Sequence, residues 1–222
     1  MRFVVKEQSY ETLIASGQFK YVVDGEATGA VEMWRLSAAT TGYEVVRVDL
    51  DARSAPSGHS YLYHLVRQSN GRPIRLSYRF WGDELTIEGT LLFAETNVTG
   101  TRRVNGQTFG EDLDIAAGTG FWFPSAVGLG LAVNLGSGPA VILNNKIGGQ
   151  DTLALQQITQ DVRRQETAET EMVVAGKTVK TSAWQIEWQD QTRLVLTDEN
   201  GWPLKMERDD GLTAVETRYI WY

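Results

Sequence analysis

The side chains best suited to binding a ligand gather on neighbouring segments that we predict to be strands. Successive residues of a strand point to opposite faces, so each strand presents its polar and aromatic groups on one side. If these sides coincide across the sheet, one face carries arginines and aromatic rings, which suit a ligand with an apolar body and an anionic or sugar head. The candidate ligand-binding residues are Trp34, Arg47, Asp49, Tyr61, Tyr63, Arg67, Arg79 and Trp81.

The same residues are also typical of an exposed sheet face with ordinary cross-strand ion pairs and aromatic neighbours, each worth about 0.2–1 kcal/mol. The two interpretations differ in one expected result. If the face binds a ligand, replacing Arg47 or Arg79 by methionine weakens binding without unfolding the protein.

Catalytic and metal-binding patterns are weaker. His59 and His64 are the two histidines of the chain, so a three-histidine zinc site is excluded. A spacing of five on a strand places them on opposite faces. We predict no catalytic residue, no metal and no cofactor; an enzyme that uses His64 or Asp49 as acid or base ranks third among the functions considered.

Apolar residues alternate with a period of two through most of the chain, which is typical of half-buried strands. Turn-forming pairs such as Asn70-Gly71, Asn200-Gly201 and Asp210-Gly211 separate the segments, and such pairs favour tight turns because they tolerate positive φ. We therefore predict an all-β fold: a single domain over residues 1–222 with a large curved antiparallel sheet, either a half-barrel or an open spiral roll. The predicted strands include residues 18–23, 30–36, 43–52, 59–68, 74–81, 85–95, 98–104, 108–115, 152–162, 170–174, 178–188, 193–197, 203–208 and 213–222. Residues 152–162 suit an amphipathic helix equally well, because Leu155, Ile158 and Val162 recur at helical spacing.

The alternation fails between residues 116 and 149. Within this segment Pro124-Ser125 is a suitable helix start, and we expect one short helix or apolar loop around residues 124–133. Gly128 and Gly130 oppose the helix by about 1 kcal/mol each relative to alanine.

Composition excludes several classes of protein. The net charge of −7 and the pI near 5.0 argue against a nucleic-acid partner, and the absence of cysteine excludes disulfides and thiol chemistry. Residues 1–7 become charged after three apolar residues, so we expect no signal peptide and a cytoplasmic location. No apolar run approaches the roughly 20 residues needed to span a membrane.

The C-terminal run from Val195 to Glu207, with Asn200-Gly201 followed by Pro203-Leu204, resembles a hairpin of the LolA/LolB-like lipoprotein-carrier superfamily and of related uncharacterised and putative glycolipid-binding families. The run from Val174 to Val179 is similar to another hairpin of that group. The resemblance implies a half-barrel of about ten strands whose concave side holds an acyl chain or another apolar ligand.

These observations favour non-covalent binding of an apolar or amphipathic small molecule, lipid-like or glycolipid-like, in a cavity of the curved sheet. The alternative is a structural or protein-interaction module. An open sheet leaves two edges that must be covered or paired, and pairing them between two copies would give a homodimer.

Overall fold

The computed structural model describes residues 7–40, 42–82, 84–146, 148–166 and 171–222. Its main element is a curved sheet in which the strands follow the order β8-β7-β6-β5-β4-β3-β2-β1-β17-β16-β15-β14-β11-β10-β9. Strand β18 also pairs with β1. Residues 1–6, on which the signal-peptide expectation depends, lie outside the described residues, as does Thr170. The strands of the first half are β1 (Thr12–Val23), β2 (Glu26–Ala38), β3 (Tyr43–Asp51), β4 (Ser60–Gln68), β5 (Pro73–Gly82), β6 (Leu85–Phe93), β7 (Asn97–Val104) and β8 (Gln107–Asp114).

Strands β1–β8 form a continuous antiparallel meander, as the alternation predicts. In β5, Leu76, Tyr78 and Phe80 are buried, whereas Arg75 and Arg79 on the opposite face are exposed. We call the buried side of the meander the inner face and the opposite side the outer face. The prediction of an all-β, mainly antiparallel curved sheet is confirmed.

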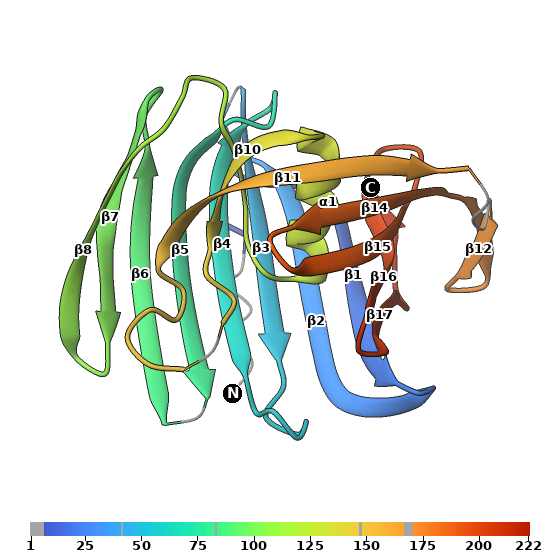
Figure 1. The fold of residues 1–222 in the computed structure, drawn as a ribbon. Helices are drawn as coiled ribbons and strands as arrows, with labels where there is room; N and C mark the ends of the chain where they lie inside the picture. The colour runs from blue at the N-terminus through green and yellow to red at the C-terminus, as the bar shows by residue number, and fades with distance from the viewer. Residues whose placement is uncertain (1–6, 41, 83, 147, 167–170) are drawn as a thin grey trace.

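The second half of the chain returns across the inner face. Figure 1 shows β11, β14 and β15 running across the meander, with the helix α1 between the two layers. The elements of this half are β9 (Gly120–Trp122), α1 (Ala126–Leu135), β10 (Gly138–Leu143), β11 (Leu155–Gln165), β12 (Glu171–Val174), β13 (Lys177–Lys180), β14 (Ser182–Trp188), β15 (Gln191–Thr197), β16 (Pro203–Arg208), β17 (Leu212–Glu216) and β18 (Ile220–Trp221).

Two strands of this half were missed in the sequence. Strands β9 and β10 pair in parallel, and nearly every residue in them is buried. Buried on both faces, they show no alternation, which is typical of strands in parallel pairs. The described sheet therefore has more strands than the resemblance implied.

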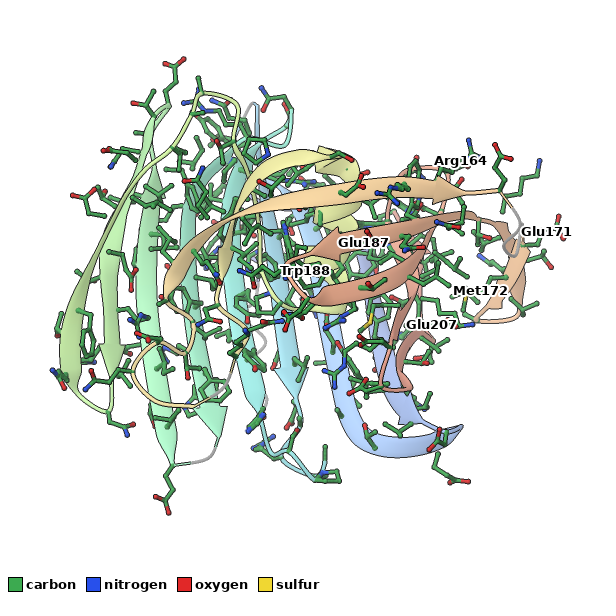
Figure 2. The ribbon with its side chains drawn as sticks, in the orientation of Figure 1. Arg164, Glu171, Met172, Glu187, Trp188 and Glu207 are labelled. Atoms are coloured by element: carbon green, nitrogen blue, oxygen red, sulfur yellow. The ribbon has the colours of Figure 1, made fainter. Side chains whose placement is uncertain are left out.

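The predicted hairpin of residues 170–174 and 178–188 is wrong in one respect. Strand β12 pairs with β13 alone, in a separate two-stranded sheet, and β14 pairs with β11 and β15 of the main sheet. The single predicted strand is interrupted at Thr181. Figure 2 shows Glu171 and Met172 on this hairpin, to one side of the main sheet.

The helix expected around residues 124–133 is present as α1. Its two glycines allow the helix to pack closely against its neighbours. A Cβ atom on Gly128 would lie 1.8 Å from the carbonyl oxygen of Phe123, and one on Gly130 would lie 2.4 Å from Cδ of Pro203 in β16. The helix therefore approaches its neighbours more closely than any residue with a side chain permits. In the described part of the chain, no helix is long and apolar enough to cross a membrane.

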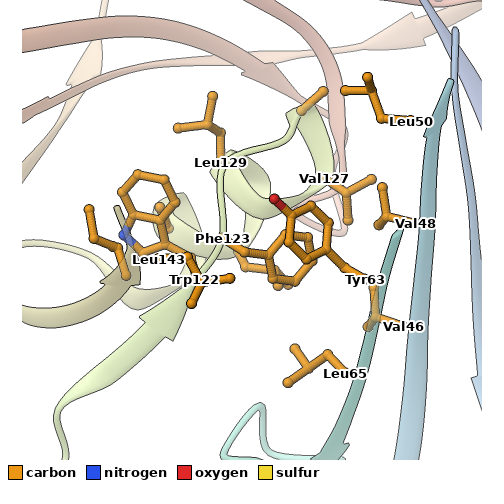
Figure 3. Packing of buried hydrophobic residues seen from close by; sticks show 14 of the residues in the cluster. Val46, Val48, Leu50, Tyr63, Leu65, Trp122, Phe123, Val127, Leu129 and Leu143 are labelled. Atoms are coloured by element: carbon orange, nitrogen blue, oxygen red, sulfur yellow. The ribbon is translucent and has the colours of Figure 1, made fainter. Parts of the chain in front are cut away.

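The core lies between the meander and α1. Figure 3 shows the Tyr63 and Phe123 rings together, close to Val127 of the helix and Val48 of β3. The Tyr63 and Phe123 rings stack with centroids 4.4 Å apart. The core thus fixes α1 against β3 and β4.

The segment between β10 and β11 fastens the far end of the meander. The Arg102 guanidinium of β7 donates to the carbonyls of Gln150 and Thr152, and the backbone N–H of Leu155 donates to Oε2 of Glu111. Arg102 and Glu111 themselves form a buried ion pair at 2.7 Å. Side chains and loop, rather than a strand ladder, therefore join the two layers at this side.

Candidate ligand-binding cavity

A cavity of about 440 Å³ lies between the inner face of the meander and the C-terminal strands. We call it the Trp188 cavity. Its wall is mainly apolar and aromatic, and the residues that contribute most of this character are Tyr21, Leu50, Tyr61, Trp122, Leu129, Trp188 and Met206. Small-molecule sites typically have volumes of about 300–1,000 Å³ and apolar walls with a few polar groups.

Two tryptophans form one wall of this cavity. The Trp122 and Trp188 rings meet edge to face, with centroids 5.0 Å apart. Trp122 donates its indole N–H to Oε1 of Gln160 at 2.8 Å, whereas the indole N–H of Trp188 is buried and has no partner among the described residues. Figure 2 shows Trp188 at the end of β14 that lies over the meander.

The polar groups of the cavity wall include Arg193 and Arg208. These residues are direct cross-strand partners on β15 and β16. Arg193 is almost completely buried, and its guanidinium lies 5.2 Å from the centre of the Trp188 ring. The cavity therefore combines an apolar wall with positive charge.

A buried carboxylate holds the helix that borders the cavity. Glu32 on β2 is fully buried and accepts the backbone N–H groups of Ala126 and Val127, each at 3.0 Å. Ser125 caps the helix by accepting the N–H of Gly128 at 2.9 Å. The unpaired N–H groups of a helix start attract negative charge, so Glu32 ties α1 to the meander.

Tyr21 completes this arrangement by donating its hydroxyl to Oε2 of Glu32 at 2.5 Å. Burial raises the pKa of Glu32, against the lowering effect of these hydrogen bonds. Burial, together with the neighbouring Glu32 carboxyl, also raises the pKa of Tyr21 well above its ordinary value. Tyr21 lines the Trp188 cavity, so the anchor of the helix lies directly beside the candidate site.

A second cavity of about 430 Å³ lies at the C-terminal end of the same helix. We call it the Arg67 cavity. Leu131, Asn134 and Leu135 of α1 line it, as do Arg67 and Phe121. Arg67 is paired there with Glu44, with Nε 2.9 Å and Nη2 2.8 Å from the same carboxylate oxygen.

A smaller pocket of about 210 Å³ opens on the outer face, where Arg35, Arg47, Asp49 and His64 contribute to its lining. Arg47 forms a buried ion pair with Glu11 at 2.7 Å. Burial, and then the charge of Arg47, lower the pKa of His64, which favours the neutral imidazole.

The structure separates the predicted ligand-binding residues. Cross-strand register aligns Trp34 with Val48 and Tyr63 on the inner face, whereas Arg47 lies opposite Arg35 and His64 on the outer face. The polar sides of adjacent strands do not coincide, so the eight predicted residues do not lie on one face of the sheet. Trp34, Tyr61, Tyr63 and Arg67 lie on the inner-face side, and Arg47, Asp49, Arg79 and Trp81 lie on the outer-face side.

Of these predicted residues, Tyr61 lines the Trp188 cavity and Arg67 lines the Arg67 cavity. Four others contribute to the lining of the 210 Å³ pocket: Trp34, Arg47, Asp49 and Tyr63. Trp34 is buried and donates its indole N–H to Oε2 of Glu216 at 2.7 Å. Arg79 lies 3.9 Å from Glu88 at the protein surface. A binding role for the predicted set as a whole stays a prediction.

Sequence reasoning missed Arg193, Arg208 and Glu32 as site residues. One signal was present for Arg193, which shares its strand face with the fully buried Val195. A charged residue in line with a core residue is unusual enough to indicate a special environment. Glu32 offered the same signal beside Trp34.

No known family model matches the chain, and no curated protein matches it. One solved structure, described as a beta-barrel-like protein of the domain of unknown function DUF1849 from Brucella abortus, is similar with a TM-score of 0.49 and 10% identity over 95% of this chain and 98% of that chain. The curved sheet agrees with the fold that the resemblance to LolA/LolB-like proteins implied. Membership of that superfamily stays a prediction.

Proposed function

We propose that this protein binds an apolar or amphipathic small molecule, lipid-like or glycolipid-like, in the Trp188 cavity without forming a covalent bond. The observation that supports this most strongly is the cavity itself: about 440 Å³ with an aromatic and aliphatic wall. An apolar ligand gains roughly 25 cal/mol for each Å² of apolar surface removed from water.

The surroundings of the cavity support a preformed site. Leu129 of α1 and the N-cap residue Ser125 border the cavity, and Glu32 of β2 holds the start of the helix. A site whose walls are already ordered requires little ordering on binding, which increases affinity.

The alternative expectation is self-association through sheet edges, and the charges on the edge strand β8 oppose it. This edge strand carries Glu111, Asp112 and Asp114 and no basic residue. Pairing β8 with a second copy would bring like charges together, and charged edges are a known protection against such pairing.

The test is a titration with the uncharged fluorescent probe N-phenyl-1-naphthylamine, followed by displacement with dodecanol. Leu129→Trp is expected to fill the Trp188 cavity and abolish binding. The matched control is Leu131→Trp: it lies on the same helix and is equally buried, but it lines the Arg67 cavity.

Circular dichroism checks that both variants fold, and Ala30→Leu, also in the wall of the Trp188 cavity, replaces Leu129→Trp if that variant does not. Equal probe affinity in the wild type and in a folded cavity-filling variant contradicts the proposal. A dimer at all concentrations with no bound probe would support the edge-pairing alternative.

A further inference from the structure

We infer that the ligand of the Trp188 cavity is a single-chain amphiphile with an anionic oxygen head group, a carboxylate or a phosphate, bound by Arg193 and Arg208. This inference rests on the proposed function and adds the chemistry of the head group. It depends on how the positive charge in the cavity wall is compensated.

Arg193 carries a buried charge with weak compensation. Its side chain is 9% exposed, and the nearest carboxylate in the described residues, Asp209, lies 3.4 Å away on a side chain that is 64% exposed. The remaining partners are neutral: the carbonyl of Thr192 at 2.6 Å and Oε1 of Gln191 at 2.7 Å. Because solvent weakens the attraction of an exposed carboxylate, the cost of burying the Arg193 charge is only partly offset.

The second arginine increases this cost. Arg208 lies directly opposite Arg193 on the neighbouring strand, and like charges in that position repel. Burial, and then the charge of Arg208, lower the pKa of Arg193. Arg208 pairs with Asp210 at 2.8 Å, but the Asp210 side chain is 54% exposed, so solvent weakens this pair. An anion between the guanidiniums would relieve the repulsion.

Trp188 supplies an additional donor in the same wall. It is 3% exposed, and its indole N–H has no hydrogen-bond partner among the described residues. Indole can only donate, so a group that satisfies it must accept hydrogen bonds. Arginine and indole donors on one wall therefore favour a head group rich in acceptor oxygens.

The opposite wall determines the rest of the ligand. Leu50 and Tyr61 of the meander and Leu129 of the helix offer apolar surface without a charged side chain. A ligand that is anionic at one end and apolar along its length matches both walls. A wholly apolar molecule leaves the two arginines with only their solvent-exposed aspartates and leaves the Trp188 N–H without an acceptor.

The experiment compares dodecanoate, dodecyl phosphate and dodecanol at equal chain length, below their micelle concentrations, by displacement of N-phenyl-1-naphthylamine at pH 8. We expect at least one anion to bind about tenfold more tightly than the alcohol, the equivalent of one charge-assisted hydrogen bond. The anion that binds more tightly identifies the head group as carboxylate or phosphate.

Arg193→Met is expected to remove the preference for the anions over dodecanol. Arg163→Met is the matched control, because Arg163 is 62% exposed and does not line the cavity; it is expected to keep the preference. If Arg193→Met does not fold, Arg208→Met provides the same comparison at a more exposed position.

The outcomes separate the two proposals. If all three compounds bind equally well to the wild type, or if a folded Arg193→Met or Arg208→Met keeps the full preference for anions, the inference about the head group is overturned and the proposed function stands. If neither the probe nor any of the three compounds binds, the proposed function itself fails.

Discussion

The two cavities at the ends of α1 have nearly the same volume, about 440 and 430 Å³, but differ in how their arginines are paired. In the second cavity, Arg67 contacts one carboxylate oxygen of Glu44 through two nitrogens, and both side chains are mostly buried. In the first, Arg193 is more deeply buried and lies 3.4 Å from an exposed aspartate. Volume alone does not distinguish the cavities, whereas the compensation of buried charge does.

The two cavities keep their separate walls only if α1 stays fixed between them. Glu32→Ala, which removes the anchor of the helix, is expected to have the largest effect. The substitution leaves the N–H groups of Ala126 and Val127 and the Tyr21 hydroxyl without their acceptor. We expect a loss of about 3–5 kcal/mol in the free energy of unfolding, measured by urea denaturation. Tyr21→Phe, which removes one donor, is expected to cost about 1 kcal/mol. A loss for Glu32→Ala no larger than that of Tyr21→Phe would contradict the anchoring role.

Gly130→Ala tests the packing of the same helix. Alanine favours a helix over glycine by about 1 kcal/mol, but its Cβ would lie 2.4 Å from Pro203. We expect the clash to dominate and to lower stability by about 1–3 kcal/mol. Gly110→Ala on β8 is the control, because no atom lies within 4 Å of the added Cβ. A more stable Gly130→Ala protein would show that the helix can shift.

Because the two arginines are paired differently, the same substitution by methionine is expected to change the free energy of unfolding differently at Arg67 and at Arg193. Arg67→Met leaves the mostly buried Glu44 side chain without its partner and is expected to lower the free energy of unfolding by about 1–2 kcal/mol. Arg193→Met removes a buried charge that faces Arg208 and is expected to be neutral or slightly stabilising. Equal destabilisation by both, measured in urea, would remove the contrast between the cavities.

The pH dependence of stability tests the raised pKa of Glu32. Because the pKa of Glu32 is raised in the folded protein, the folded state binds more protons than the unfolded state above about pH 4.5. The protonated Glu32 side chain makes its full contribution to the free energy of unfolding below that pH. This contribution is lost as the pH rises through the pKa of Glu32 in the folded protein, with a slope of at most about 1.4 kcal/mol per pH unit. Glu32→Gln is expected to lack this slope, so the difference between wild type and variant should narrow as pH rises. A difference independent of pH would contradict the raised pKa.

The meander was predictable because one of its faces is buried and the other is exposed. In β5 the predicted strand of residues 74–81 differs from Pro73–Gly82 by one residue at each end. Strands β9 and β10 were not predictable in this way, because α1 and the neighbouring strands bury both of their faces. Apolar and polar residues alternate only where one face of a strand is buried and the other is exposed, and both faces of these strands are buried.

The site was less predictable than the fold, since alternation gives the face of a residue only within its own strand. Whether Arg47 shares a side with Tyr63 depends on the register across β3 and β4, which are joined by the connection from residue 52 to residue 59. The Trp188 cavity in turn combines Tyr61 with Arg193, more than a hundred residues later. Only the return of the C-terminal strands across the meander brings them together.

The most direct test of the central claim is to locate a bound ligand. Crystals soaked with 12-bromododecanoic acid give an anomalous bromine signal that marks the chain, and the carboxylate appears in the electron density. We predict the bromine inside the Trp188 cavity, beside Leu50, Tyr61 or Leu129, and the carboxylate beside Arg193 and Arg208. Bromine confined to the Arg67 cavity or to the outer face, with an empty Trp188 cavity, would contradict the account.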